Sequence, residues 1–148
     1  VPGTPQEAFN VELRYQSPRF FFFNITGNYF RQQWLDFNPV RRSYEALQGV
    51  AEHSDQWNSI IAQTMFPPCF TLNLFTGKSW RLPSQQKGIY RTLLFNIGIS
   101  NLLNDQSIAS GGYEQLRFDI NTRDINKFPP KFFYAYGINF FAGLTLRL

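Results

Sequence analysis

Residues 132–148 read FFYAYGINFFAGLTLRL, and this stretch decides the fold class. One of its two alternating rows is apolar or aromatic up to the last position: Tyr134, Tyr136, Ile138, Phe140, Ala142, Leu144, Leu146 and Leu148. The other row holds small and polar residues such as Gly137, Asn139 and Thr145, with Phe141 as its exception. A period of two is typical of a β-strand with one face in apolar and one in polar surroundings. We therefore predict a strand over 132–148.

Four earlier segments alternate in the same way: 8–15, 19–31, 69–82 and 89–101. These segments are about as long as a tilted strand must be to cross the ~30 Å hydrocarbon core of a bilayer. The sequence therefore predicts an all-β chain that forms part of a transmembrane antiparallel up-and-down β-barrel.

The connections between these segments alternate between short and long. Short turns follow the first and third strands, whereas residues 32–68 and 102–131 form long loops. Outer-membrane barrels have short periplasmic turns and long extracellular loops, so this alternation favours a barrel over a soluble β-sandwich. Both long loops are then expected outside the cell.

The polar row of each predicted strand is largely uncharged, which suits a water-filled lumen. We predict the following lumen-facing residues: Asn10, Glu12, Arg14, Asn24, Thr26, Asn28, Thr71, Asn73, Asn96 and Asn139. Lys78 and Arg91 fall in the apolar rows. Both are expected near the periplasmic turns, where long side chains can extend to the membrane surface. Aromatic residues near strand ends, including Tyr15, Trp80 and Tyr90, match the aromatic girdle of such barrels.

The long loops carry the candidate ligand-binding residues Trp34, Asp36, Arg41, Arg42, Tyr113, Glu114 and Arg117. Arg41 and Arg42 either grip an anionic ligand or pair within the loop with Asp36 or Glu45, and the second interpretation is favoured. In the second loop, Glu114, Arg117 and Asp119 are expected to form a charged network. Residues 43–65 have helical spacing in parts, and Ser54 with Asp55 is a start signal for a helix.

Composition and motifs argue against several functions. The chain of 148 residues is 18% aromatic but only 16% charged, and its net charge of +4 is not concentrated in a basic run, which argues against nucleic-acid binding. His53 has no second His or Cys nearby, and we find no nucleophile with a plausible partner and no phosphate-binding loop. We therefore expect no enzyme activity and no cofactor or metal.

Several stretches resemble the C-terminal part of TonB-dependent outer-membrane receptors of the Bacteroidetes type. They include VPGTPQEAFNVELRY, FTLNLFTGKSW, GGYEQLRFD and KFPPKFFYAYG, and they cover nearly the whole chain in the same order. The resemblance implies a barrel of about 22 strands with a plugged lumen. This chain would hold the last five strands and would lack the plug domain.

The resemblance also implies function, location and partners. The expected function is import of a nutrient ligand across the outer membrane of a Gram-negative bacterium, and the chain is expected to be inactive alone. Its expected partners are lipid, the rest of the barrel and plug, the TonB complex, the barrel-assembly machinery and a surface lipoprotein. The alternatives are a structural or multi-chain outer-membrane barrel without import, and a soluble aromatic-rich β-sandwich binding module.

The C-terminal residues resemble the signal that the barrel-assembly machinery recognises. Gly143, Leu144, Leu146 and Leu148 are the positions that match this signal. The chain departs from the usual pattern at Ala142, where a polar residue is common, and at Leu148, where an aromatic residue is usual.

Overall fold

A computed structural model describes residues 3–83 and 91–147 and divides the chain into two compact units. The first unit, here called the loop unit, comprises Val1–Glu7, Phe30–Cys69 and Ser107–Ala135. The second unit, here called the sheet unit, comprises Ala8–Tyr29, Phe70–Gln106 and Tyr136–Leu148. Each unit is described by itself below.

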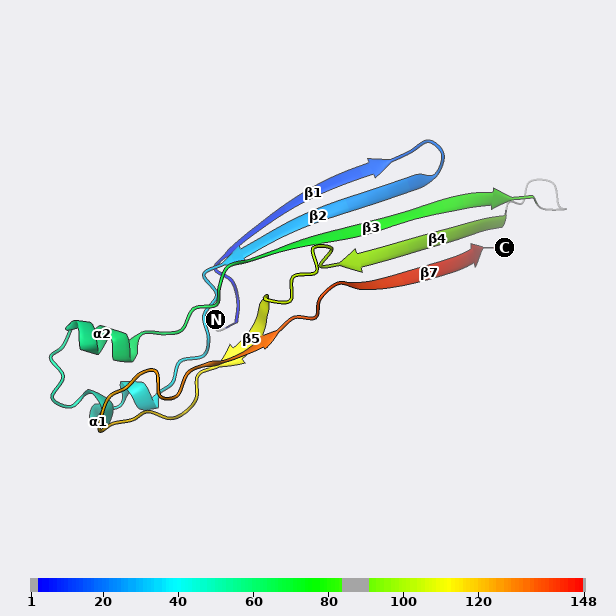
Figure 1. Cartoon of the computed structure of the whole chain (residues 1–148). Helices are drawn as coiled ribbons and strands as arrows, with labels where there is room; N and C mark the ends of the chain where they lie inside the picture. The colour runs from blue at the N-terminus through cyan, green and yellow to red at the C-terminus, as the bar shows by residue number, and fades with distance from the viewer. Residues whose placement is uncertain (1–2, 84–90, 148) are drawn as a thin grey trace. The chain divides into compact units, whose positions relative to one another are not determined.

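The sheet unit is built on one five-stranded sheet with the strand order β1-β2-β3-β4-β7 (Figure 1). The strands of this sheet are β1 (Glu7–Gln16), β2 (Phe21–Arg31), β3 (Cys69–Leu82), β4 (Arg91–Ser100) and β7 (Asn139–Arg147), of which the terminal residues Glu7, Phe30, Arg31 and Cys69 belong to the loop unit. The first four correspond to the predicted segments 8–15, 19–31, 69–82 and 89–101. The pairs β3–β4 and β4–β7 are antiparallel, and strand residues dominate the described chain. The described part is therefore mainly antiparallel β-structure, as predicted.

The turn between β1 and β2 is tight because Phe20 has a positive φ of 60°. The backbone N–H of Phe20 donates to the carbonyl of Ser17 at 3.1 Å, and the N–H of Ser17 donates to the carbonyl of Phe21 at 2.7 Å. The predicted turn between β3 and β4, including Tyr90, lies outside the described residues.

The prediction of one continuous strand over 132–148 is wrong. The chain instead forms β6 (Lys131–Tyr134) and then β7, with an interruption around Gly137. In this interruption the side chain of Asn101 donates to the carbonyl of Tyr136 at 3.2 Å, and Asn104 Oδ1 accepts from the N–H of Ile138 at 2.9 Å. Side-chain amides thus form hydrogen bonds with backbone groups that, in a continuous strand, would bond to a neighbouring strand.

The loop unit contains more regular structure than was predicted for its two long connections. Strand β5 (Ala109–Tyr113) lies inside the expected loop 102–131 and pairs antiparallel with β6. The other loop forms a short 3-10 helix (Val40–Arg42) and the helices α1 (Tyr44–Leu47) and α2 (Asp55–Ile61). Ser54 caps α2 because its hydroxyl accepts a hydrogen bond from the N–H of Trp57 at 3.2 Å, which confirms the predicted start signal.

The loop unit has its own small hydrophobic core. Leu35, Phe66 and Ala109 are buried together, and Phe132 packs against them. The rings of Phe66 and Phe132 meet edge to face with centroids 5.7 Å apart. This core ties strands β5 and β6 to the first long loop.

Candidate functional site

The sheet unit presents an apolar face on which large side chains stand exposed. This face comprises, among others, Phe9, Val11, Leu13, Phe70, Leu72, Leu93, Phe95, Phe140, Leu144 and Leu146. Val11 is 74% exposed, Phe140 76% and Leu144 69%. A shallow groove on this face is lined by eight residues of β1, β2 and β3, from Phe9 and Ile25 to Leu72, none of which is charged. An exposed apolar surface that spans several strands marks an interaction with lipid or another protein.

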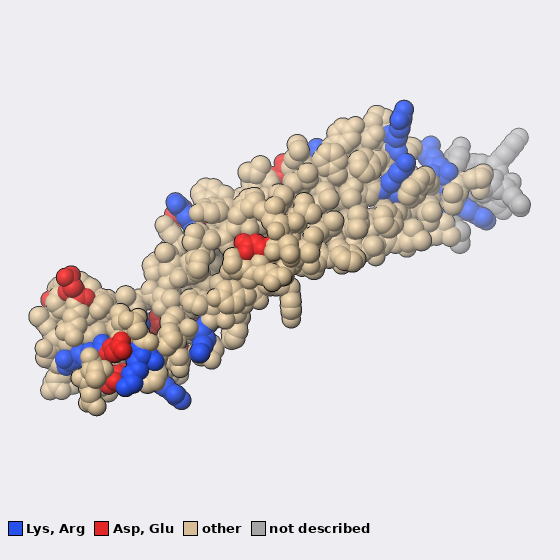
Figure 2. Space-filling model, in the orientation of Figure 1, with Lys and Arg blue, Asp and Glu red and all other residues tan. Residues whose placement is uncertain are grey.

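Charged residues are few among the strand residues that share the parity of this face. Glu7, the first residue of β1, pairs with Arg31, the last residue of β2, and both belong to the loop unit. Lys78 and Arg91 also lie on the apolar face, because Lys78 pairs with Phe95 and Arg91 with Leu82 in the register. Arg91 is the first residue of β4, whereas Lys78 lies four residues before the end of β3. In the space-filling view, few charged atoms lie over the middle of the sheet on the visible side (Figure 2).

The opposite face of the sheet is polar and mostly uncharged. Asn10 donates to Asn28 Oδ1 at 2.7 Å, and Asn28 donates to the hydroxyl of Thr71 at 3.2 Å, which forms a ladder across three strands. The register places Asn96 opposite Gly143, and strand alternation places Asn73 on the same face as Thr71. The ten residues predicted to face a lumen share this face. That the face borders a lumen stays a prediction.

An aromatic cluster interrupts the polar face. The ring of Phe75 lies 5.5 Å from that of Phe22 and 6.2 Å from that of Phe141, measured between centroids. Gly77 and Gly98 make room for the cluster, since a Cβ atom on Gly77 would come 2.8 Å from the Phe22 ring and one on Gly98 would overlap the ring of Phe141. Sequence reasoning noticed Phe141 but missed Phe22 and Phe75. Their position parity, shared with Asn24 and Asn73, could have revealed them.

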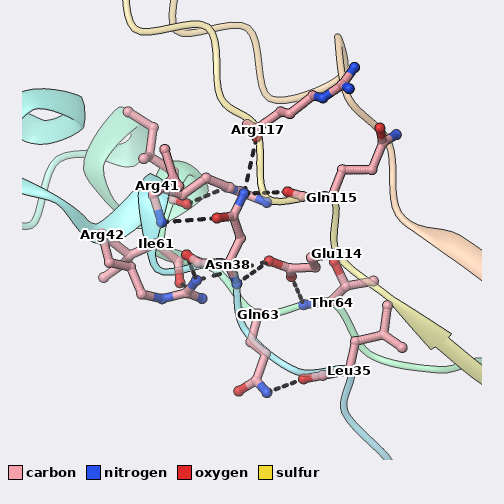
Figure 3. A network of polar contacts seen from close by, with 12 residues as sticks. Leu35, Asn38, Arg41, Arg42, Ile61, Gln63, Thr64, Glu114, Gln115 and Arg117 are labelled. Carbon is pink, nitrogen blue, oxygen red and sulfur yellow. Dashed lines mark hydrogen bonds and ion pairs between the residues drawn. The ribbon is translucent and has the colours of Figure 1, made fainter.

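A buried polar network lies in the loop unit, and Asn38 and Glu114 stand at its centre (Figure 3). The carboxylate of Glu114 accepts from the N–H of Asn38 at 2.8 Å and from the N–H of Thr64 at 3.0 Å. The side chain of Asn38 donates to the carbonyls of Gln115 at 2.5 Å and Arg117 at 3.0 Å. These contacts join the two long loops at several backbone points.

Arg41 and Arg42 do not make the ion pairs with Asp36 or Glu45 that were favoured. Arg41 donates to the carbonyls of Ser59 at 2.7 Å and Ile60 at 2.8 Å, and Arg42 donates to that of Ile61 at 2.5 Å. The last carbonyls of a helix lack intrahelical partners, so the two guanidinium groups cap the C-terminus of α2. Arg42 also lies 3.9 Å from the carboxylate of Glu114. Partial burial lowers the pKa of Arg42, and the repulsion from Arg41 acts in the same direction.

The arginine pair binds backbone carbonyls in the structure. The guanidinium groups donate to backbone carbonyls within the loop unit, and both residues are partly buried. The pair therefore acts in the structure as a clamp on α2. The alternative in which it holds an anionic ligand gains no support from this geometry.

The predicted network of Glu114, Arg117 and Asp119 is also wrong. The guanidinium of Arg117 lies over the ring of Phe128, 6.0 Å from its centroid, while Asp119 pairs with Lys127. Hydrogen bonds from Lys127 and Thr122 hold the pKa of the Asp119 carboxyl well below its usual range. The second loop thus contains two separate charged contacts, since Glu114 binds the N–H of Asn38 and Asp119 pairs with Lys127.

The remaining candidate ligand residues lie on two parts of the loop unit. Trp34 and Asp36 line a cavity of about 150 Å³ together with Phe66 and Gly112. Tyr113 lies beside Phe133, with ring centroids 6.0 Å apart. The structure thus brings Trp34 and Asp36 to one cavity, and Tyr113 does not line it.

The residues of the expected assembly signal lie in β7. Gly143 stands opposite Asn96, and a Cβ atom there would come 2.5 Å from Asn96 Oδ1. Leu144 and Leu146 lie on the apolar face opposite Phe95 and Leu93. Leu148 lies outside the described residues.

The described residues contain no cluster of His, Cys, Asp and Glu side chains that is able to hold a metal ion. In the same part of the chain, no helix is long and apolar enough to span a membrane. Comparison with known protein families, curated proteins and solved structures finds no match to this chain. The assignment of function therefore depends on the two faces of the sheet and on the sequence stretches quoted above.

Proposed function

We propose that the sheet unit is part of the wall of a transmembrane β-barrel, with its apolar face toward lipid and its polar face toward a lumen. The particular protein that we propose is a TonB-dependent receptor that imports a nutrient ligand across the outer membrane of a Gram-negative bacterium. The proposal that the sheet is part of a barrel wall is supported by the different character of its two faces. The import function rests on the sequence resemblance, most of all on GGYEQLRFD and KFPPKFFYAYG.

The observation that carries the proposal is the separation of side chains between the two faces of one sheet. Apolar residues as large as Phe140 remain exposed on one face, whereas amides form hydrogen bonds along the other. The strands have 9 to 14 residues, which suits a tilted transmembrane strand. In water, exposure of this apolar face would be unfavourable by ~25 cal/mol for each Å².

The edges of the sheet support a larger assembly. Strands β1 and β7 each have one neighbour among the described strands, so their outer backbone groups face away from the sheet. Unpaired backbone groups are not tolerated in the hydrocarbon core, so a barrel in lipid must close. In our proposal the rest of the barrel pairs with β1 and β7, and the loop unit forms part of the extracellular surface.

Adjacent positions in β7 allow a direct test in the complete protein within its membrane. Spin labels are attached to Leu144→Cys and Thr145→Cys in a Cys69→Ser background, and their accessibility is measured by electron paramagnetic resonance. We expect the label at 144 to be accessible to oxygen and the label at 145 to a water-soluble nickel complex. Equal access of the nickel complex to both labels would contradict a lipid-facing apolar surface.

Import is tested separately, because a barrel without transport would give the same labelling result. Cells that carry the complete protein are expected to lose uptake of its ligand when TonB is removed, while the barrel remains in the outer membrane. Growth on candidate nutrients that does not depend on TonB would favour the structural barrel instead.

A further inference from the structure

Two cations on the apolar face of the sheet unit lie close to one tryptophan. Lys78 and Trp80 are on β3, and Arg91 is on the neighbouring strand β4. The register pairs Trp80 with Leu93 and Leu82 with Arg91, so Trp80 and Arg91 occupy successive rows of the same face. Rows on one face are two residues, or about 6.6 Å, apart along a strand.

The side chain of Lys78 leans toward the end of its strand. Its own row contains Phe95 and Leu144 and is therefore apolar, yet its ammonium lies over the ring of Trp80, 5.5 Å from the centroid. Trp80 is one row nearer to the end of β3. A lysine on a lipid-facing surface extends its ammonium toward the boundary between the hydrocarbon core and the polar headgroups. The direction of the Lys78 side chain therefore indicates that this boundary lies near the row of Trp80.

The strand residues described at this corner of the sheet include no acidic group to neutralise the two cations. Strands β3, β4 and β7, which the structure describes over their full lengths, contain no Asp or Glu. Lys78 and Arg91 are both exposed. Two cations at the edge of an apolar face suit the phosphate of a lipid headgroup, because they attract its negative charge. The neighbouring indole ring suits the same lipid, because it can contact the acyl chains below the phosphate.

We propose that Lys78, Trp80 and Arg91 form a binding site for the headgroup phosphate of an anionic phospholipid. The proposal rests on the apolar face being the lipid-facing one. It further predicts which leaflet is involved, because Arg91 begins β4 and the Lys78 ammonium extends toward the same end of the sheet, where the short turn between β3 and β4 is expected. In our proposed orientation this is the periplasmic leaflet.

The test uses the complete protein in phosphatidylcholine vesicles that contain phosphatidylglycerol, with one of the two lipids brominated on its acyl chains. Bromine quenches tryptophan fluorescence at short range, and the signal of Trp80 is isolated by subtracting that of the Trp80→Phe variant. We expect brominated phosphatidylglycerol to quench Trp80 more strongly than brominated phosphatidylcholine at the same fraction. The Lys78→Gln/Arg91→Gln variant is expected to reduce this preference about fivefold for each charge removed.

The opposite face offers a matched control. Arg81 and Arg147 both pair with Thr92, so they lie at the same end of the sheet but on the polar face. The Arg81→Gln/Arg147→Gln variant removes the same charge and should retain the preference for phosphatidylglycerol. The charge-preserving variant Lys78→Arg/Arg91→Lys should retain it as well, which separates loss of charge from disturbed folding.

The outcomes distinguish this site from the proposed membrane wall. Quenching by both lipids without a preference for phosphatidylglycerol, or equal loss in the two glutamine variants, would overturn the headgroup site and leave the wall intact. If neither brominated lipid quenches Trp80, the lipid-facing surface is overturned as well.

Discussion

The loop unit and the sheet unit treat their apolar and polar groups in opposite ways. In the loop unit, Leu35, Ile60 and Phe66 are buried, and the buried carboxylate of Glu114 is held by backbone donors. In the sheet unit, residues as large as Phe140 are exposed on one face, while Asn10 and Asn28 pair on the other. The loop unit buries apolar side chains and pairs the Glu114 carboxylate internally, although Arg123 Nε is buried there without a hydrogen-bond partner. The sheet unit instead has an exposed apolar face that needs apolar surroundings, and the described chain does not supply them. Such surroundings are what lipid would provide.

The largest expected effect is in the loop unit, at Glu114. The Glu114→Ala variant leaves the buried N–H of Asn38 and the partly buried N–H of Thr64 without an acceptor, and Arg42 without its carboxylate. We expect the loop unit to lose about 3 kcal/mol of stability, since each unsatisfied buried donor costs ~1–3 kcal/mol. Hydrogen exchange at the amides of residues 38 and 64 measures this change. Leu116→Ala, at an exposed side chain two residues away, is the control, and equal protection in the two variants would contradict the role of Glu114.

The second prediction compares the two faces of the sheet unit at neighbouring positions of β4. Ile97→Arg places a charge in the middle of the apolar face, which costs ~2–4 kcal/mol if that face meets lipid. Asn96→Arg places the same charge on the polar face and is expected to cost much less. The urea midpoint of the complete protein in lipid gives both values. Equal midpoints for the two variants would argue that the faces do not differ in their surroundings.

A smaller effect is expected at the aromatic cluster of the polar face. Gly98→Ala adds a Cβ atom into the space of the Phe141 ring, and such overpacking costs ~1–3 kcal/mol. The double variant Gly98→Ala/Phe141→Ala should recover most of the lost stability, because the ring that is displaced is no longer there. Absence of this rescue would indicate that Gly98 is needed for another reason.

The smallest effect concerns the exposed turn at Asp119 in the loop unit. Its lowered pKa means that the carboxylate contributes stability above its unfolded pKa of ~3.9 and that this contribution is lost as the pH falls toward the folded value. We expect the amide shifts of Asn121 and Thr122, whose N–H groups bond to Asp119, to be constant from pH 8 to 5 and to change only below about pH 4. Asp119→Asn should abolish the change, and a midpoint above pH 4 would contradict the lowered pKa.

Local signals predicted much of the secondary structure. The alternation of residues such as Val11 and Leu13 with Asn10 and Glu12 was sufficient to locate β1, because a strand exposes alternate residues to opposite faces. Ser54 marked the start of α2 for an equally local reason, since an N-cap depends on the next three residues. The same reading failed at Gly137, where Asn101 and Asn104 reach across from another segment.

The candidate site was predicted less completely than the fold. Arg41 and Arg42 were correctly noticed as a pair, but their acceptors are carbonyls at the end of α2, about twenty positions away in the chain. Glu114 is 76 positions from Asn38, and nothing in the sequence links them. Polar partners across such distances depend on how the loops fold together, and a carbonyl acceptor carries no residue identity that a sequence could reveal.

By itself the sequence determined the two-faced strands and the nearly charge-free apolar row, because both follow from residue type and a period of two. Only the tertiary structure decided that the rings of Phe22 and Phe141 both lie beside that of Phe75, that Glu114 joins two loops, and that the ammonium of Lys78 lies over Trp80. These features depend on strand register and on contacts between distant segments. Register is a property of two paired strands, so the sequence of one strand does not determine it.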